Sequence, residues 1–139
     1  MRKSKKGFTI VEILVVIILI SLIATVIVPK MFKGIGEQKA RLTKAKMATL
    51  ETAVQRFYLD CERYPDDSEG LEALLTPPSG LEDFWKGPYL KASDLLDAWK
   101  NPYIYVANGT INPGSFDLIS YGADGVEGGE GDNADIVND

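Results

Sequence analysis

One charged residue inside a long apolar run constrains this chain more than any other feature. Residues 8–28 are twenty-one positions with a single charge, Glu12. A helix of about 20 residues is long enough to cross the apolar core of a bilayer. The run exceeds the roughly 7 to 15 apolar residues of a cleaved secretory signal, and its end, TVIVPKMF, offers no A-x-A-like cleavage site. The sequence therefore predicts a transmembrane helix.

The charges that precede this helix predict its orientation. Four basic residues come before the apolar run: Arg2, Lys3, Lys5 and Lys6. Because basic flanks stay on the cytoplasmic side, everything after Pro29 is expected to cross the membrane. A carboxylate in the hydrocarbon costs about 3 kcal/mol on insertion scales and usually has a functional partner. A plain anchor would have no use for Glu12.

A partner for Glu12 can be argued from its position. Cleavage between Gly7 and Phe8 would create an α-amino group on Phe8, four residues before Glu12. The more productive pairing is between neighbours, where the amine of an incoming subunit neutralises the glutamate of a packed one. Two desolvated opposite charges attract strongly, whereas a lone one is penalised. Glu12 is therefore predicted to fix the register of subunits.

The segment from Gly7 to Glu12, GFTIVE, carries a family resemblance. With a basic leader before it and an apolar helix after it, it resembles the class III signal of type IV pilins and type II secretion pseudopilins. The resemblance implies that a membrane peptidase cuts after Gly7 and methylates Phe8, and that Glu12 guides subunits into a helical filament. The alternative, an uncleaved anchor with a stray glutamate, leaves the coincidence of Gly7, Phe8 and Glu12 unexplained.

After the apolar run the pattern becomes amphipathic. Pro29, followed by Gly34 and Gly36, predicts that the helix kinks or loosens between about residues 28 and 36. Apolar residues then recur at spacings of three and four: Met47, Leu50, Val54, Phe57 and Cys61. This predicts a helix to Cys61 that stops before Tyr64-Pro65. Cys61, on the apolar face, is expected to be a buried side chain rather than a reactive thiol.

The remaining residues predict a small mixed head. A short helix is expected near Ser68 to Leu75, with Ser68 as N-cap. Residues 103–106 and 115–120 are predicted to be antiparallel strands, separated by the turn-forming NGT and NPG segments. Five aromatic residues are expected to fill the core rather than bind a sugar or peptide: Trp85, Tyr89, Trp99, Tyr103 and Tyr105.

The order of these segments narrows the resemblance. RYP, EGLEALLTPP, WKGPYL, DAWKNPYIY and FDLISYGADG, followed by an acidic glycine-rich end, resemble the major pseudopilins of type II secretion systems. The resemblance implies an α+β fold: a long N-terminal helix on a small three-stranded antiparallel sheet with a calcium-binding C-terminal loop. The expected segments are a leader (1–7), an assembly helix (8–30) and a head (31–139) with a variable region (62–98) and a sheet-and-loop region (99–139).

Residues 121–139 are predicted to bind Ca²⁺ rather than to form a disordered acidic tail. The segment has six acidic residues and five glycines, and calcium takes six to eight oxygen ligands from carboxylates and carbonyls. Glycines permit the tight backbone that such a loop needs. The expected ligands are Asp124, Asp132, Asp135 and the backbone carbonyls of Tyr121 and Val126. Asp117 is a doubtful ligand, whereas Glu127 and Glu130 are expected to face water.

Composition limits the possible functions. There is no histidine, Cys61 is the only cysteine, and no Lys or Arg follows Lys100. The missing histidine removes the usual acid–base catalyst at neutral pH. The single cysteine excludes an intrachain disulfide and Cys-rich zinc sites. The lack of basic residues after Lys100 argues against binding of nucleic acid. The chain has no phosphate-binding GxxxxGK[ST] motif, so a separate cytoplasmic ATPase would supply the work of assembly. An enzymatic role, as a membrane-anchored hydrolase, is a remote alternative without a visible nucleophile and base.

The resemblance implies that the chain is a structural, non-enzymatic subunit of a pseudopilus that helps move folded proteins across the outer membrane. The resemblance implies that the chain polymerises with itself and meets minor pseudopilins, the prepilin peptidase and an inner-membrane assembly platform. It implies a single-pass inner-membrane protein with a periplasmic head, which joins a periplasmic filament after assembly. The alternative is a major type IV pilin for adhesion, motility or DNA uptake, which the missing disulfide and the matching C-terminal segment disfavour.

Overall fold

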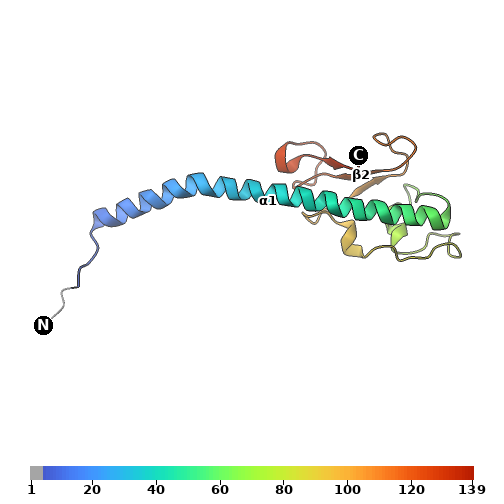
Figure 1. Cartoon of the computed structure of the whole chain (residues 1–139), viewed down its shortest axis with the longest axis horizontal. Helices are drawn as coiled ribbons and strands as arrows, with labels where there is room; N and C mark the ends of the chain where they lie inside the picture. The colour runs from blue at the N-terminus through green and yellow to red at the C-terminus, as the bar shows by residue number, and fades with distance from the viewer. Residues whose placement is uncertain (1–4) are drawn as a thin grey trace. The chain divides into compact units, whose positions relative to one another are not determined.

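The computed structural model describes residues 5–139, so Arg2 and Lys3 of the basic leader lie outside the described residues. The chain divides into two compact units, residues 1–36 and Glu37–Asp139. One helix, α1 (Ile10–Cys61), has its N-terminal half in the first unit and its C-terminal half in the second (Figure 1). The helix ends at Cys61, as the Tyr64-Pro65 signal predicts.

The apolar half of α1 exposes all of its side chains. Every residue from Ile10 to Lys33 is exposed, and this part of the helix is long and apolar enough to cross a membrane. Its two hydroxyl groups bond within the helix: Ser21 Oγ donates to the carbonyl of Ile17, and Thr25 Oγ1 to that of Leu22, both at 2.8 Å. Such internal pairing suits a hydrocarbon environment, where no water is available.

The helix remains α-helical through Pro29. The expected interruption between residues 28 and 36 is therefore not present in the single chain. Proline has no N–H, so the carbonyl of Thr25 loses the backbone donor that residue 29 would otherwise supply. One missing hydrogen bond weakens the helix locally without ending it.

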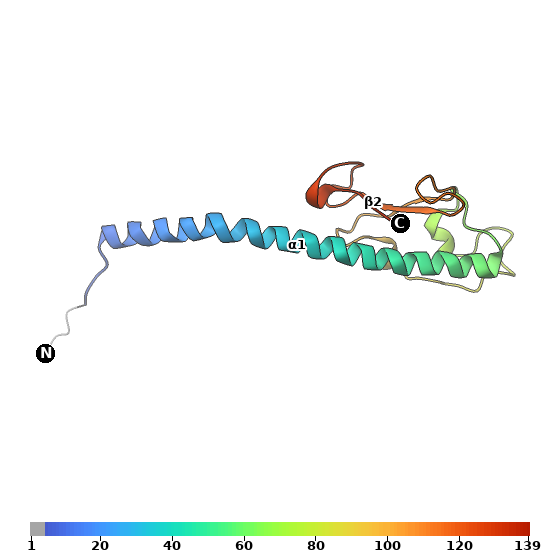
Figure 2. The same ribbon diagram turned by 45° about the horizontal axis from the view of Figure 1, so that its top comes forward.

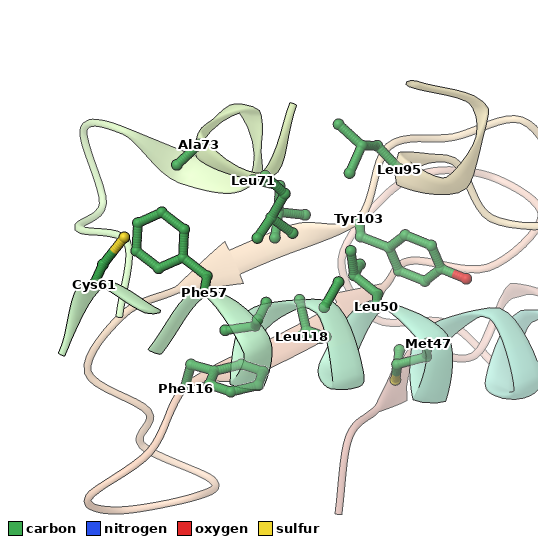
Figure 3. Close-up of a cluster of buried hydrophobic side chains, with 13 residues drawn as sticks. Met47, Leu50, Phe57, Cys61, Leu71, Ala73, Leu95, Tyr103, Phe116 and Leu118 are labelled. Atoms are coloured by element: carbon green, nitrogen blue, oxygen red, sulfur yellow. The ribbon is translucent and has the colours of Figure 1, made fainter. Parts of the chain in front are cut away.

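The amphipathic half of α1 supplies one side of the core. Met47, Leu50, Val54, Phe57 and Cys61 are all buried, which confirms the face predicted from their spacing. These residues form one cluster with side chains of the sheet and of the connecting segments, and Figure 3 labels Met47, Leu50, Phe57 and Cys61 among them. The residues that complete the cluster include Leu71, Leu74, Leu95, Tyr103, Phe116 and Leu118.

A three-stranded antiparallel sheet lies along this half of α1 (Figures 1 and 2). The order is β1 (Ile104–Val106), β2 (Asp117–Ser120) and β3 (Ile136–Val137). The first two strands are the two predicted, each shorter by one or two residues at its start. The third, Ile136–Val137, pairs with β2 so that Ser120 lies opposite Ile136. This pairing closes the acidic loop between β2 and β3.

A buried threonine ties α1 to the segment that precedes β1. Thr43 is fully buried, and its Oγ1 accepts a hydrogen bond from the backbone N–H of Ala98 at 3.1 Å. The hydroxyl of Tyr103 donates to the carbonyl of the same residue at 2.9 Å. Polar as well as apolar contacts therefore fix the helix to the rest of the second unit.

The short helices differ from the prediction. Instead of a helix from Ser68 to Leu75 there is a 3-10 helix, η1 (Gly70–Leu74), and Ser68 is not its cap. The hydroxyl of Ser68 donates to Asp66 (2.6 Å), whose carboxylate accepts the backbone N–H of Glu69 (2.8 Å). An ionised carboxylate is a stronger hydrogen-bond acceptor than a hydroxyl, so Asp66, and not Ser68, accepts the backbone N–H at this turn. The 3-10 helices η2 (Ala92–Leu95) and η3 (Gly131–Asn133) were not predicted, because such short turns carry no 3.6-residue pattern.

The aromatic residues act mainly as core residues, as predicted. Tyr103 is buried, and Trp85, Tyr89 and Tyr105 pack against the cluster, while Trp99 is partly buried. Two of them have polar atoms that find partners inside the fold: the Trp85 indole donates to the carbonyl of Ala73 at 2.8 Å, and the Tyr105 hydroxyl to that of Pro65 at 2.7 Å. Satisfied in this way, the rings of Trp85 and Tyr105 bury apolar area without leaving an unpaired donor.

Candidate functional site

The first turn of α1 contains Glu12, which is exposed. The helix starts at Ile10, so Phe8 lies outside it and is 84% exposed. Phe8 precedes Glu12 by four residues, which is about one turn of a helix, but the two do not lie one turn apart on a continuous helix in the uncleaved chain. Gly7 and Phe8 belong to an exposed non-helical segment, which is the conformation that a peptidase can reach.

Thr9 sets the start of the helix, and this role was missed from the sequence. Its hydroxyl oxygen accepts the backbone N–H of Glu12 at 3.2 Å, and its carbonyl accepts that of Ile13 at 3.2 Å. The side-chain bond satisfies one of the four free N–H groups at a helix start. The T-x-x-E spacing of Thr9 and Glu12 is the capping-box signal that could have identified it.

The acidic loop between β2 and β3 is a closed turn. The backbone N–H of Ala123 donates to the carbonyl of Asp132 at 2.9 Å, which joins the two arms of the loop. All five of its glycines have a positive φ, as the tight backbone requires: Gly122, Gly125, Gly128, Gly129 and Gly131. At Gly129 a Cβ atom would lie 2.6 Å from the carbonyl oxygen of Asn133, so a larger residue would force the arms apart.

The three predicted aspartate ligands have different surroundings. The Asp124 carboxylate is exposed and accepts the N–H of Val126 at 3.2 Å, and Asp132 is also exposed. Asp135 is partly buried directly before β3, and its Oδ2 accepts the N–H of Gly128 at 3.0 Å. Over residues 5–139, no three acidic or other metal-binding side chains converge as a ready cluster. The structure thus brings Asp135 into the loop and leaves the other two carboxylates at its surface.

One atom of this loop fits a cation. Oδ1 of Asp135 is buried and has no hydrogen-bond partner among residues 5–139. A buried carboxylate oxygen without a donor is costly unless a positive charge or water satisfies it. The predicted metal ligands of the loop are all oxygen atoms, which suits a hard cation such as Ca²⁺. Of the two residues predicted to supply a carbonyl, Tyr121 is partly buried at the loop entrance and Val126 is exposed. Glu127 and Glu130 are both exposed.

Comparison with known proteins connects these features. Residues 30–139 match the family model "Type II secretion system (T2SS), protein G", and residues 2–28 match the "Prokaryotic N-terminal methylation motif". The chain belongs to the type II secretion system protein G family. Similar proteins include the type II secretion system core protein G of Pseudomonas aeruginosa, 39% identical over 99% of this chain and 96% of that protein. That of Vibrio cholerae is 38% identical over 99% and 95%, respectively.

A solved structure agrees with this assignment. The major pseudopilin from the type 2 secretion system of enterohaemorrhagic Escherichia coli has a TM-score of 0.62 and 25% identity. The match covers 81% of this chain and 96% of that one. The expected family and α+β fold, one long helix with a three-stranded antiparallel sheet, are therefore confirmed.

Asp117, which was a doubtful ligand on sequence, organises the turn before β2. It is 1% exposed, and its carboxylate accepts hydrogen bonds of 2.8 to 3.0 Å from the backbone N–H groups of Thr110, Ile111 and Asn112. Burial raises the pKa of the Asp117 carboxyl, but these N–H donors and the Asn112 amide outweigh it, so the pKa lies below its ordinary value. The turn-forming NGT and NPG segments just before Asp117 are the sequence signal for this role.

This carboxylate predicts a pH dependence of stability. Because its pKa is lowered in the folded state, Asp117 stabilises the head fully above the unfolded value of about 3.9, and the contribution is lost as the pH falls through the folded pKa. Asp117→Asn is expected to lower the free energy of unfolding at neutral pH by about 2 kcal/mol. Thermal melts between neutral and acid pH should show that the variant loses less stability on acidification than the parent. Parallel loss in both proteins would contradict this role.

Proposed function

We propose that this chain is the repeating structural subunit of the periplasmic pseudopilus of a type II secretion system, which helps move folded proteins across the outer membrane. The observation that carries the proposal is the exposure of every side chain from Ile10 to Lys33 beside the processing motif. Such an apolar surface requires lipid around it before assembly and copies of the same helix after assembly. The role is structural, since the work of polymerisation comes from a separate ATPase.

The same proposal places the chain in the cell. Before assembly it is a single-pass inner-membrane protein whose head lies in the periplasm. A prepilin peptidase cuts after Gly7 and methylates Phe8, and an inner-membrane platform then adds the subunit to the filament, in which minor pseudopilins also take part. The matches to the protein G model and to the methylation motif support this sequence of events.

Calcium belongs to this proposal as a structural ion. Asp124, Asp132 and Asp135, with the carbonyls of Tyr121 and Val126, would hold it. The ion would neutralise the acidic loop and satisfy the buried Oδ1 of Asp135. It would replace the disulfide that closes the C-terminal region of many pilins, which this chain, with Cys61 as its single cysteine, cannot form within itself.

Complementation tests the proposed function. Expressed in a bacterium whose own major pseudopilin gene is deleted, the chain is expected to restore secretion of folded proteins and to form periplasmic filaments when overproduced. A chain with Gly7→Leu, which blocks processing, is the matched control and should restore neither. Restored surface motility or DNA uptake in a strain that lacks its own major pilin, without restored secretion in the pseudopilin deletion, would favour the pilin alternative.

A second expected result concerns the helix around Pro29. We expect residues 23–36 to lose helical hydrogen bonds in the filament, because Pro29 has already removed one bond and Gly34 and Gly36 are weak helix formers. Hydrogen exchange on assembled filaments should show fast-exchanging amides there and protected amides at Leu50 and Val54. Continuous helical hydrogen bonding through residues 23–36 would refute this expectation.

A further inference from the structure

A buried hydrogen-bond cluster lies next to the acidic loop but outside it in sequence. Its centre is Asp97, which is 1% exposed and precedes β1 by several residues. One carboxylate oxygen of Asp97 accepts the hydroxyl of the buried Ser120 at 2.7 Å. The other accepts the backbone N–H groups of Trp99 and Asn101 at 2.9 and 3.0 Å. Asp97 therefore fixes both the end of β2 and the turn that carries Asn101.

Two of the partners of Asp97, Ser120 and Asn101, hold Gly122, the first glycine of the loop, from both sides. The N–H of Gly122 donates to Ser120 Oγ at 3.3 Å, and the carbonyl of Gly122 accepts Asn101 Nδ2 at 3.1 Å. Gly122 is buried with φ of 77°, and a Cβ atom there would lie 2.8 Å from the carbonyl oxygen of Asp132. The entrance of the loop, at Gly122, is thus packed against its exit, at Asp132.

Asn101 touches the loop at a second point. A Cβ atom on Gly125 would lie 3.3 to 3.4 Å from the amide atoms of Asn101, so the backbone at Gly125 packs against this side chain. Gly125 directly follows Asp124, one of the three predicted aspartate ligands. One side chain from residues 97–101 therefore contacts the backbone on both sides of the stretch that presents Asp124.

We propose that Asn101, oriented by Asp97, is a positioning residue for calcium, so that the affinity of the loop depends on a segment about twenty residues before it. The inference rests on the calcium role proposed above. A loop whose entrance is already fixed loses less conformational freedom when the ion binds, which raises affinity. Asn101 acts through the backbone of Gly122 and Gly125 and does not itself bind the ion.

The test compares Asn101→Ala with Asn112→Ala in the full chain in detergent. Both asparagines are partly buried, and both donate a side-chain N–H; that of Asn112 reaches Asp117 at 3.0 Å, at the opposite end of β2. Calorimetric calcium titration should show about tenfold weaker binding for Asn101→Ala, at the lower end of what such supporting residues contribute. Asn112→Ala should lower Tm in chelator but keep the parent's affinity.

The outcomes separate the inference from the calcium proposal. If the parent chain binds no calcium, the calcium proposal fails. If the parent binds and Asn101→Ala binds equally well, or if Asn112→Ala weakens binding as much, the positioning role is wrong. Should Asn101→Ala not fold in chelator, Ser120→Ala removes the other contact to Gly122 and is expected to weaken calcium binding in the same direction; unchanged binding there would overturn the inference.

Discussion

Replacing Glu12 by alanine is expected to abolish filament formation while the chain still enters the membrane. In the filament, the cleaved amine of Phe8 would lie among apolar helices, and without a carboxylate it would be an unpaired buried charge. Such a charge costs about 3 to 5 kcal/mol, which corresponds to a factor of about 100 or more in the assembly equilibrium. Electron microscopy of overproducing cells and membrane fractionation would measure the two effects separately.

Two further variants make this result specific. Glu37→Ala removes a carboxylate of α1 that lies after the apolar run and is exposed, and it should leave filaments intact. The chain with Gly7→Leu never produces the Phe8 amine, so it should lack filaments like Glu12→Ala although its glutamate is intact. Filaments of normal number in Glu12→Ala cells would contradict the ion pair.

Removing calcium is expected to lower the melting temperature of the head by about 10 to 20 °C. At a calcium concentration about 100 times the Kd, binding stabilises a folded protein by about 2.7 kcal/mol. For a domain of about this size, each kcal/mol shifts Tm by about 4 to 8 °C. Calorimetric melts with calcium and with chelator give the difference directly.

The loop residues sharpen this second test. Asp124→Ala should abolish the effect of chelator, and so should Asp135→Asn, which keeps an oxygen for the N–H of Gly128 but loses the charge. Glu127→Ala removes an exposed carboxylate of the same loop and is the matched control, with a shift like that of the parent. Identical melting curves of the parent with and without calcium would exclude a structural ion.

The parts of this fold that sequence analysis predicted are those with a local periodic signal. Burial of Leu50 and Phe57 follows from their spacing of seven residues along one helical face, and the end of α1 at Cys61 follows from the nearby Pro65. The first two strands stand between recognisable turns. The processing motif could be read because its residues lie within six positions of one another.

The candidate loop was only partly predictable, because its supports are distant in sequence. Glycine content predicted the tight turn, but nothing near Gly122 indicates that Asn101 holds its carbonyl. The buried Asp97 resembles any surface aspartate until β2 brings Ser120 beside it. Asp135 is partly buried whereas Asp124 is exposed, and this difference likewise depends on the pairing of β3 with β2. The two apolar residues of β3 alone do not predict that pairing.

The contacts of Thr43 have a mechanical consequence. If a subunit is drawn out of the membrane as proposed, a pull on α1 would reach the folded head as a shear force between the helix and its neighbours. The two hydrogen bonds at Thr43, from Ala98 and Tyr103, would resist that shear in parallel. If the helix slipped by one turn, about 5.4 Å, both hydrogen bonds would break together. The helix can therefore transmit tension to the head only in the register that these two bonds fix.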